Sequence, residues 1–265
     1  MPIESIHVHR FAEGSCPPPA LIDSHFFPEV LAGGFTRNDG NVAFYQRINA
    51  LVSSSSVLID FGAGRGASHY VSYRRRLSNF KGRVSRVVGL DVDPAVMANP
   101  SLDEAFLLGP DGRAPLPAGT ADIIFSDFVF EHFRDPIQSA AEIDRLLKPG
   151  GWICARTPNR FGYIAVANRL IPDQMSNLVL KILQPWRKPE QVFPAFYRLN
   201  TPGTLRKFFP PSRFEHFVYT WDDAEPLYHA NSRILYRAFL ALKYLTPPPL
   251  KPFLMIFIRK KSGTG

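Results

Sequence analysis

A glycine-rich turn that directly follows a short apolar strand constrains the fold of this chain more than any other feature. Residues 57–61 read Val-Leu-Ile-Asp-Phe, an apolar run that is typical of a buried parallel strand. Residues 62–66 continue as Gly-Ala-Gly-Arg-Gly. Because glycine lacks a Cβ atom, this turn lets a ligand approach the main chain closely. The sequence therefore predicts a ligand site where the first strand ends.

The alternation of strands and helices continues along the chain. Further strands are expected at residues 87–91, 106–108, 122–127 and 152–157. Helices are expected to begin near residues 41 and 67, and a third helix is expected between the last two of these strands. Asp135 can cap this third helix, and Pro136 suits its first position. The alternation predicts an α/β fold with a doubly wound, Rossmann-like sheet and helices on both faces.

The chain becomes less regular after residue 157. We interpret residues 158–200 and 221–250 as insertions, because prolines interrupt or end the helical stretches that they contain. The remaining expected elements are a helix at 202–209 and strands at 214–220 and 253–258. The expected organisation is an irregular N-terminal segment at 1–40 and a single domain at 41–265 that carries the two insertions.

Cysteine content and hydrophobicity exclude several classes of protein. The chain has two cysteines, Cys16 and Cys154, too few for a disulfide framework or a cysteine zinc cluster. Its first residues lack the apolar core of a signal peptide, and no apolar run approaches the roughly 18 residues that span a bilayer. These features favour a cytoplasmic protein. No spaced metal-ligand motif occurs either, so we expect no metal site.

The charge of the chain is unevenly distributed. Its formal net charge is +8, but residues 1–157 carry 15 Lys and Arg against 17 Asp and Glu. Residues 158–265 carry 16 against 6. Such an excess favours an anionic partner, which could be nucleic acid, phospholipid or a small acidic substrate, unless it forms only a solvated surface.

Two classes of ligand use a glycine turn of this kind. The pattern Gly62-x-Gly64-x-x-Ala67 fits the dinucleotide fingerprint, in which a pyrophosphate lies at the N-terminus of the next helix. The pattern Asp60-x-Gly62-x-Gly64-x-Gly66 adds an acid at the end of the strand. That carboxylate suits a ligand that carries a cation and would not help to bind a pyrophosphate. A purely structural turn is the third interpretation.

With its neighbours, this second pattern resembles the class I S-adenosylmethionine-dependent methyltransferases, in particular the small-molecule group called type 11. The segments that carry the resemblance are Asp60–Gly66, Val88–Asp91, Gly109–Pro117 with Asp111, Ala121–Phe133 and Leu146–Trp152. The resemblance covers residues 41–157 firmly and the last two strands weakly. It implies a seven-stranded sheet that is mostly parallel, with an antiparallel last strand.

The resemblance also implies S-adenosyl-L-methionine as the cofactor. The residues that it implies for cofactor binding are Asp60, Gly62, Ala63, Gly64, Gly66, Asp91, Val92, Asp111, Asp127 and Phe128. Among them, Asp91 would bind the ribose hydroxyls. Asp111 would contact the adenine amino group, although it stands one position from the usual spacing.

His132 is the candidate general base. It follows Glu131 just after the fourth strand, and a histidine with its ordinary pKa near 6.5 can take a proton at neutral pH. A packing role beside the cofactor is the alternative. Tyr197 and Arg198 lie in an aromatic-rich segment before the sixth strand and are the candidates for acceptor contact. Core aromatics beside a surface arginine are the alternative interpretation there.

We favour a methyltransferase that acts on a small or lipid-linked, anionic acceptor. One alternative is an NAD(P)-dependent oxidoreductase, in which Asp91 would also bind a ribose, but the chain lacks the catalytic Tyr-x-x-x-Lys pairing. Another is a nucleic-acid-binding protein on the same fold, although the basic residues are scattered. Peripheral contact with an anionic membrane, at its inner face, is a further hypothesis, since the helix expected at about 231–245 is amphipathic, basic and aromatic.

Overall fold

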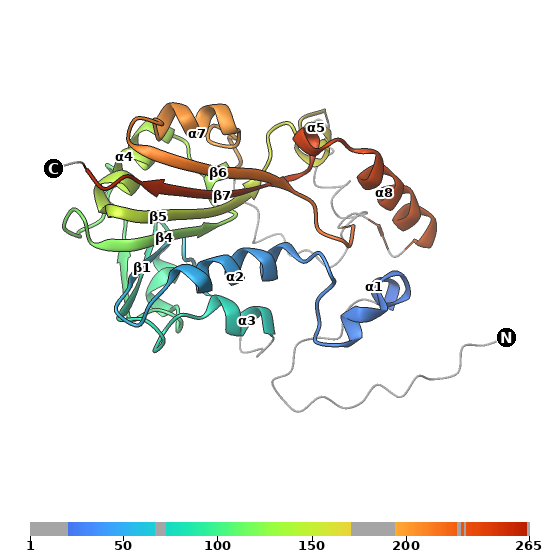
Figure 1. The fold of residues 1–265 in the computed structure, drawn as a ribbon, viewed down its shortest axis with the longest axis horizontal. Helices are drawn as coiled ribbons and strands as arrows, with labels where there is room; N and C mark the ends of the chain where they lie inside the picture. Colours follow the sequence, from blue (N-terminus) through green and yellow to red (C-terminus); the bar gives the residue numbers. More distant parts are fainter. Residues whose placement is uncertain (1–20, 67–72, 171–193, 227–228, 231, 264–265) are drawn as a thin grey trace.

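Apolar, β-branched runs form a seven-stranded sheet in the order β3-β2-β1-β4-β5-β7-β6 (Figure 1). The structure is a computed structural model that describes residues 21–66, 73–170, 194–226, 229–230 and 232–263. The strands are β1 (Val57–Phe61), β2 (Arg86–Asp91), β3 (Glu104–Leu107), β4 (Ala121–Asp127), β5 (Leu147–Pro158), β6 (Phe214–Trp221) and β7 (Phe253–Lys260). The expected doubly wound, Rossmann-like sheet is confirmed.

The first five strands, β1 through β5, pair parallel to one another, whereas the last strand, β7, runs in the opposite direction. β7 lies between β5 and β6 and pairs antiparallel with both. The register places Asp60 beside Gly89 and Phe125, and Asp127 beside Arg156. Because parallel strands end at the same edge, this register gathers the polar residues that follow β1, β2, β4 and β5. The expected antiparallel last strand is confirmed.

Helices cover both faces of the sheet. The α-helices are α1 (Leu21–Phe26), α2 (Gly40–Leu51), α3 (Tyr73–Ser78), α4 (Pro136–Leu146), α5 (Tyr163–Leu170), α7 (Pro202–Phe208) and α8 (Arg233–Leu245). Short 3-10 helices are η1 (Pro28–Leu31), η2 (Pro94–Ala98), η3 (Phe130–His132) and η5 (Pro248–Leu250). In Figure 1, α2 and α3 lie below the sheet, α4 and α7 lie above it, and α1, α5 and α8 stand at its right-hand end.

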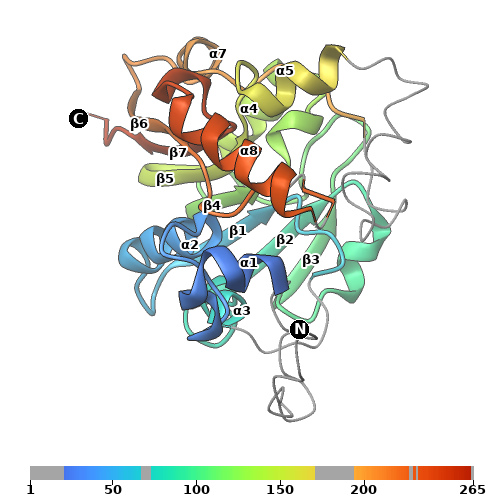
Figure 2. The same ribbon diagram turned by 90° about the vertical axis from the view of Figure 1, so that its right-hand side faces the viewer.

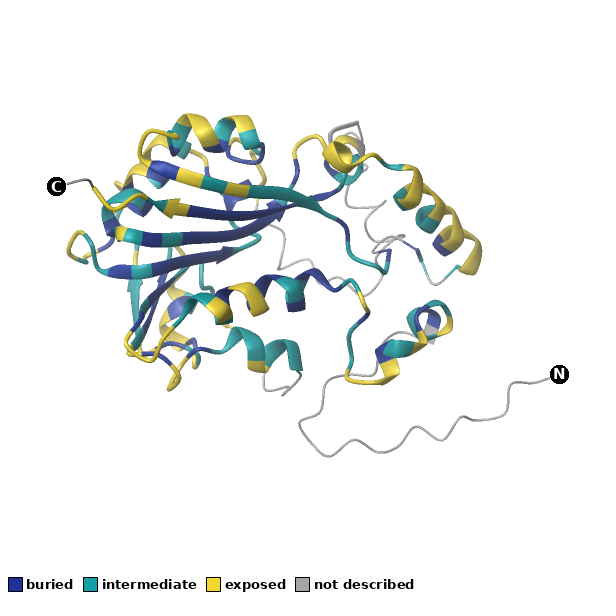
Figure 3. Ribbon diagram, in the orientation of Figure 1, coloured by how far each residue is buried: buried dark blue, intermediate teal, exposed yellow. Residues whose placement is uncertain are grey.

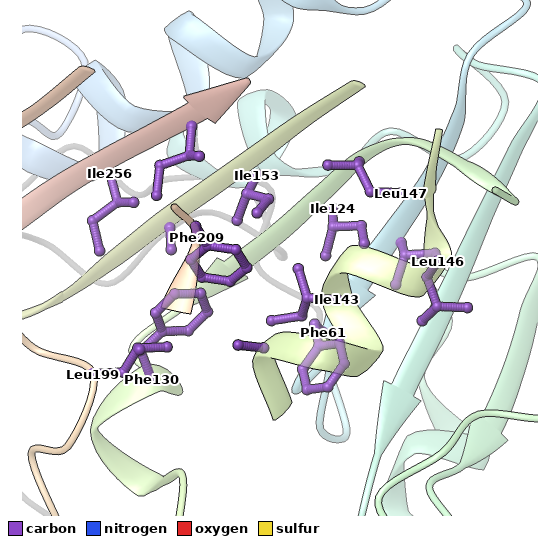
Figure 4. Packing of buried hydrophobic residues seen from close by; sticks show 14 of the residues in the cluster. Phe61, Ile124, Phe130, Ile143, Leu146, Leu147, Ile153, Leu199, Phe209 and Ile256 are labelled. Carbon is purple, nitrogen blue, oxygen red and sulfur yellow. The ribbon is translucent and has the colours of Figure 1, made fainter. Parts of the chain in front are cut away.

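Each face of the sheet has its own apolar core. Phe44 and Ile48 of α2 pack on one face with Leu58. Ile143 and Leu146 of α4 pack on the other face, in the cluster drawn in Figure 4. The central strands are dark blue in Figure 3, which shows that they are buried from both sides. The caps expected from the sequence hold α4 in place, since the Asp135 carboxylate accepts hydrogen bonds from the N–H groups of Ile137 and Gln138.

The N-terminal segment differs from the expectation. Residues 1–40 were expected to be irregular, yet α1 and η1 form within the described residues 21–40. The local sequence gives little helix signal there. Instead, Ile22 and Phe27 pack against the buried Tyr236 of α8, so a contact distant in sequence stabilises this helix.

Parts of three other expectations lie outside the described residues. The helix expected to begin near residue 67 is described only from Tyr73 onward, as α3. Of the first insertion, residues 171–193 are outside the description. Its beginning contains α5, and the second insertion contains α8. The division into one domain with two insertions stays a prediction. In the part of the chain that is described, no helix has the length and apolar character needed to cross a bilayer.

Candidate functional site

A cavity of about 710 Å³ lies at the carboxyl ends of β1, β2 and β4. Its walls come from the glycine turn after β1, the end of β2, the loop after β3, η3 and the start of α4. The side chains and backbone that line it include Gly62, Asp91, Val92, Gly109, Gly112, Val129, His132, Arg134, Gln138 and Arg198. In open α/β sheets, ligands bind at this edge.

The glycine turn is folded onto the neighbouring strand by its own backbone. The N–H groups of Gly62 and Ala63 both donate to the carbonyl oxygen of Leu90, over 2.7 and 3.2 Å. Gly62 has a φ of +84°, and an added Cβ would run into the side chain of Val129. Gly64 has a φ of +52°, and no described atom lies within 4 Å of where its Cβ would be. Glycine adopts these conformations without strain, and the turn at Gly64 leaves room for a ligand against the backbone.

The carboxylate of Asp91 is held by two backbone donors. Its Oδ2 accepts a hydrogen bond from the N–H of Gly64 over 2.8 Å, and its Oδ1 accepts one from the N–H of Asp93 over 2.9 Å. A carboxylate oxygen has two lone pairs, so each oxygen keeps one for a further donor. Asp91 also lines the cavity. The side chain is therefore a fixed pair of acceptors that can bind two neighbouring hydroxyl groups.

Asp60 ends β1 among other carboxylates. Burial and the negative charges of Asp127 and Asp91 together raise the pKa of its carboxyl group to about 8. Within the described residues, no hydrogen bond or ion pair reaches this carboxylate, and Arg75 opposes the rise in pKa only through its more distant charge. A cationic ligand would remove this electrostatic cost, because it would compensate the charged form of Asp60.

Asp127 forms an internal ion pair. Both of its oxygens accept hydrogen bonds from the Arg156 guanidinium over 2.8 Å, and the Tyr45 hydroxyl donates to Oδ2 over 3.3 Å. The guanidinium also lies 4.8 Å from the ring centre of Phe128. Neither Asp127 nor Phe128 lines the cavity. The expected contact of Asp127 and Phe128 with a cofactor stays a prediction.

His132 lines the cavity and is oriented by a backbone carbonyl. Its Nδ1 lies 2.8 Å from the carbonyl oxygen of Pro194. Because that oxygen can only accept, a neutral His132 carries its proton on Nδ1, and its Nε2 has the lone pair. The neighbouring Glu131 is buried, which raises the pKa of its carboxyl group, and it accepts a hydrogen bond from the Thr157 hydroxyl over 2.8 Å. The ring lines the cavity, and its Nε2 lies 3.9 Å from Oε1 of Glu131.

The segment from Pro194 to Asn200 is fastened to η3. The N–H groups of Phe196 and Tyr197 donate to the Glu131 carbonyl oxygen over 2.7 and 3.2 Å. The Arg198 guanidinium donates to the Arg134 carbonyl oxygen over 2.6 Å. Arg198 consequently lines the cavity, whereas Tyr197, with a φ of +53°, does not.

Asp111 stands outside the cavity although its neighbours line it. It is exposed in a turn that is closed by the Gly109 N–H, which donates to the Arg113 carbonyl oxygen over 2.9 Å. Gly109 and Gly112 contribute to the wall, and Gln138 donates to the Asp111 carbonyl oxygen. The backbone of this turn therefore faces the cavity, while the carboxylate that was expected to contact adenine does not line it.

The structure brings together five of the residues expected in the site, and these are Gly62, Asp91, Val92, His132 and Arg198. The others lie near the cavity without lining it, and these are Asp60, Ala63, Gly64, Gly66, Asp111, Asp127, Phe128 and Tyr197. Sequence reasoning missed Val129, Arg134 and Gln138. Their place after the fourth strand was the available signal, since residues that follow parallel strands meet at one edge.

Several known proteins that resemble this chain are named as methyltransferases. Residues 59–155 match the family described as "Methyltransferase domain". A relative from Mycolicibacterium smegmatis, named "Probable S-adenosylmethionine-dependent methyltransferase", is 32% identical over 125 residues, which cover 45% of this chain and 44% of the relative. The malonyl-(acyl-carrier protein) O-methyltransferase of Serratia marcescens is 33% identical over 103 residues, which cover 38% of this chain and 37% of the relative.

The chain thus spans less than half the length of these curated relatives. Among solved structures, an S-adenosylmethionine-dependent methyltransferase from Archaeoglobus fulgidus is similar with a TM-score of 0.51. The similarity covers 83% of this chain and 92% of that chain, at 17% sequence identity. At this identity the likeness concerns the fold alone.

Proposed function

We propose that this chain is a class I S-adenosylmethionine-dependent methyltransferase that transfers a methyl group to a small or lipid-linked, anionic acceptor, since residues 59–155 match the methyltransferase family. The observation that carries the proposal is the carboxylate of Asp91, which two backbone N–H groups hold at the wall of the cavity. The family match over residues 59–155 supports the resemblance inferred from the sequence.

The residues at the end of the sheet fit S-adenosylmethionine, the cofactor of this domain family. Its ribose offers two neighbouring hydroxyl groups, and Asp91 has one unused lone pair on each oxygen. Its methionine part carries an ammonium group, and Asp60 is a carboxylate without a described cationic partner. The turn at Gly64 has room against the backbone. When bound, the cofactor supplies a methyl carbon activated by a positively charged sulfur.

The residues of this chain would bind and orient the cofactor, and one of them would accept a proton from the methyl acceptor. Asp91 would fix the ribose, and Val92, which is 75% exposed, offers apolar surface beside it. Asp60 would favour the cationic end of the cofactor. His132 would take the proton of an acceptor at Nε2, while its bond to Pro194 keeps the ring in position. Ala63, Gly66, Asp111, Asp127 and Phe128 complete the set that we propose for the cofactor.

The proposal of an anionic acceptor rests on the charge of the cavity rim. Arg134 and Arg198 both line the cavity on the side of His132. Arginine is suited to carboxylate and phosphate groups, because its guanidinium is planar and permanently charged. A lipid-linked acceptor would place the protein at the inner face of a membrane, in peripheral contact with it. Tyr197 is retained as an acceptor contact, from the segment that carries Arg198.

In the alternative, an NAD(P)-dependent oxidoreductase, Asp91 would also bind a ribose, but Asp60 would have no role in binding the cofactor. A second carboxylate at the glycine turn repels a pyrophosphate, whereas it attracts a cation. Calorimetric titration of the full chain separates the two proposals. We expect heat of binding with S-adenosylmethionine and S-adenosylhomocysteine and none with NAD. Tight binding of NAD alone would contradict the methyltransferase proposal.

The same titration at several pH values is expected to report on Asp60. Its raised pKa of about 8 means that the free protein has this carboxyl group mostly protonated at pH 6. A cation binds the charged form, so binding releases a proton, and affinity increases with pH until the free carboxyl is ionised. We expect the Kd of S-adenosylmethionine to fall about tenfold per pH unit from pH 6 to 8 and then to level off. Asp60→Asn should remove the dependence of Kd on pH in this range. A wild-type Kd that does not change with pH would contradict the proposal that Asp60 binds the cationic end of the cofactor.

Arg198→Glu tests the charge of the acceptor. We expect the transfer of labelled methyl groups into an extract of metabolites and lipids to fall about 10- to 100-fold, because a charge-assisted contact is replaced by repulsion. The labelled product should be retained by an anion exchanger. Arg259→Glu is the matched control, since Arg259 is an exposed arginine of β7 outside the cavity. Labelling of a neutral, water-soluble product that Arg198→Glu leaves unchanged would contradict the proposal.

A further inference from the structure

The outer face of α8 is apolar and is left uncovered by the described part of the chain. Ile234 is 79% exposed and Leu245 is 81% exposed, and Leu242 is exposed between them. Ala238 and Ala241 are exposed as well. Residues spaced three or four apart share one face of a helix, so these five side chains form a continuous stripe. Figure 3 shows exposed residues along most of this helix.

The opposite face fixes α8 in this orientation. Tyr236 is fully buried, and its ring stacks on that of Phe26 with the ring centres 4.4 Å apart. Its hydroxyl donates to Asp23 over 2.9 Å. Lys243 donates to the carbonyl oxygen of Ala224 over 2.8 Å. The helix cannot turn its apolar stripe inward without breaking these contacts, so the stripe faces outward by construction.

The charge around the stripe has one sign. Residues 229–250, the segment around α8, contain Arg233, Arg237 and Lys243 and no Asp or Glu. Arg233 and Arg237 of α8 itself are exposed. Acidic side chains beside the helix make contacts inside the protein: Asp23 accepts from the Tyr236 hydroxyl, Asp222 pairs with Lys243 over 3.4 Å and Glu225 accepts a hydrogen bond from Thr36. A surface that meets this face therefore meets apolar groups bordered by cations.

The stripe stands at the end of the molecule where the site lies. Figure 2 looks onto the end of the sheet toward which the parallel strands run, and α8 crosses in front of them. The same end holds Asp91, His132 and Arg198. A partner bound to α8 would thus lie at the same end of the sheet as the cavity.

We infer that the outer face of α8 docks on the surface of an anionic lipid bilayer. A helix of 13 residues is about 20 Å long, too short to span a bilayer but long enough to lie in its interface. Interfacial helices combine an apolar stripe with flanking Lys and Arg, which is the composition seen here. Anionic headgroups add attraction for each nearby cation. The inference extends the proposed function to a partner of the protein, and it does not depend on the transferred group.

Flotation of the full chain with vesicles tests this docking surface. We expect the wild-type protein to float with phosphatidylcholine vesicles that contain about one third phosphatidylglycerol, and to bind much less in about 1 M salt. The triple variant Ile234→Gln, Leu242→Gln, Leu245→Gln should lower the ratio of vesicle-bound to free protein by about tenfold or more, because the apolar contacts with the bilayer are lost. Arg233→Glu should weaken binding to anionic vesicles only.

A matched control replaces exposed apolar residues on other elements. Met97→Gln, Leu107→Gln and Phe217→Gln change exposed side chains of η2, β3 and β6 and should leave flotation unchanged. Circular dichroism of both triple variants checks that they fold. Absence of wild-type binding at low salt, or equal loss in both triple variants, would overturn the inference. The inference would also be overturned if light scattering shows a wild-type dimer, the α8 triple variant is a monomer, and flotation is the same for both proteins. Flotation needs no cofactor, so its outcome is separate from that of the methyl-transfer assays.

Discussion

Asp91→Ala is expected to weaken the binding of S-adenosylhomocysteine by about 10²- to 10⁴-fold, which makes it the substitution with the largest effect on the cofactor. Two hydrogen bonds to a charged acceptor are lost, and each contributes about 1.5–3 kcal/mol. The Gly64 N–H also loses its acceptor, so the glycine turn is less firmly held. Calorimetry measures the change in Kd directly. Asp91→Asn should have a smaller effect, because one acceptor oxygen remains.

Asp93→Ala is the control for Asp91. Asp93 lies two residues further on and caps η2 through the Ala95 N–H, but it does not line the cavity. Its backbone N–H, which binds Asp91, is retained in the variant. We therefore expect a modest loss of stability and a nearly unchanged Kd. A folded Asp91→Ala protein that binds S-adenosylhomocysteine as tightly as the wild type would remove the basis of the cofactor site.

His132→Ala is expected to lower kcat by about 10²- to 10⁴-fold, the range typical for the loss of a general base. The Kd of the cofactor is expected to stay nearly unchanged. The physical reason is the orientation of the ring. The Pro194 carbonyl holds the proton on Nδ1 of a neutral ring, so we expect Nε2 to be the nitrogen that takes a proton from a bound acceptor. The measurement is initial rates of methyl transfer together with calorimetry on the same preparation.

His216→Ala provides the matched substitution for His132. His216 lies on β6, and its Nε2 is 2.6 Å from the carbonyl oxygen of Phe209, away from the cavity. It should change stability and leave kcat nearly as in the wild type. If His132→Ala instead reduces cofactor affinity and rate equally, the histidine packs against the cofactor and does not act as a base. A pH–rate profile that loses its acidic limb in His132→Ala would support the base.

Local chemistry of the sequence was sufficient to place the cofactor end of the site. The strand at Val57–Phe61 and the glycine turn after it form as expected, and Asp91 ends the next strand beside that turn. These features depend on residue type and short spacing alone. An apolar run forms a buried strand, and a turn with positive φ at Gly62 and Gly64 favours glycine. Asp135 and Pro136 likewise begin α4 as their preferences dictate.

The sequence was less informative about which expected residues line the cavity. Asp127 has the right position after β4, but the register of β4 and β5 sets it beside Arg156, and the two form an ion pair. Asp111 has the right chemistry, but its turn directs the backbone of Gly109 and Gly112 to the cavity. Arg156 lies 29 residues from Asp127, and Gln138, which donates to the Asp111 carbonyl oxygen, lies 27 residues from Asp111, so both contacts are beyond the reach of periodicity.

What the sequence determined by itself is the set of strands, their order along the chain, the glycine turn and the two acids that flank it, because each follows from local propensity and short spacing. What only the tertiary structure decided is how distant segments meet. Arg198 reaches the cavity because the segment that carries it binds the backbone of η3. α1 forms because Tyr236 of α8 packs against it. The same contact turns the apolar stripe of α8 outward, since burial of one face of a helix leaves the other to the solvent or to a partner.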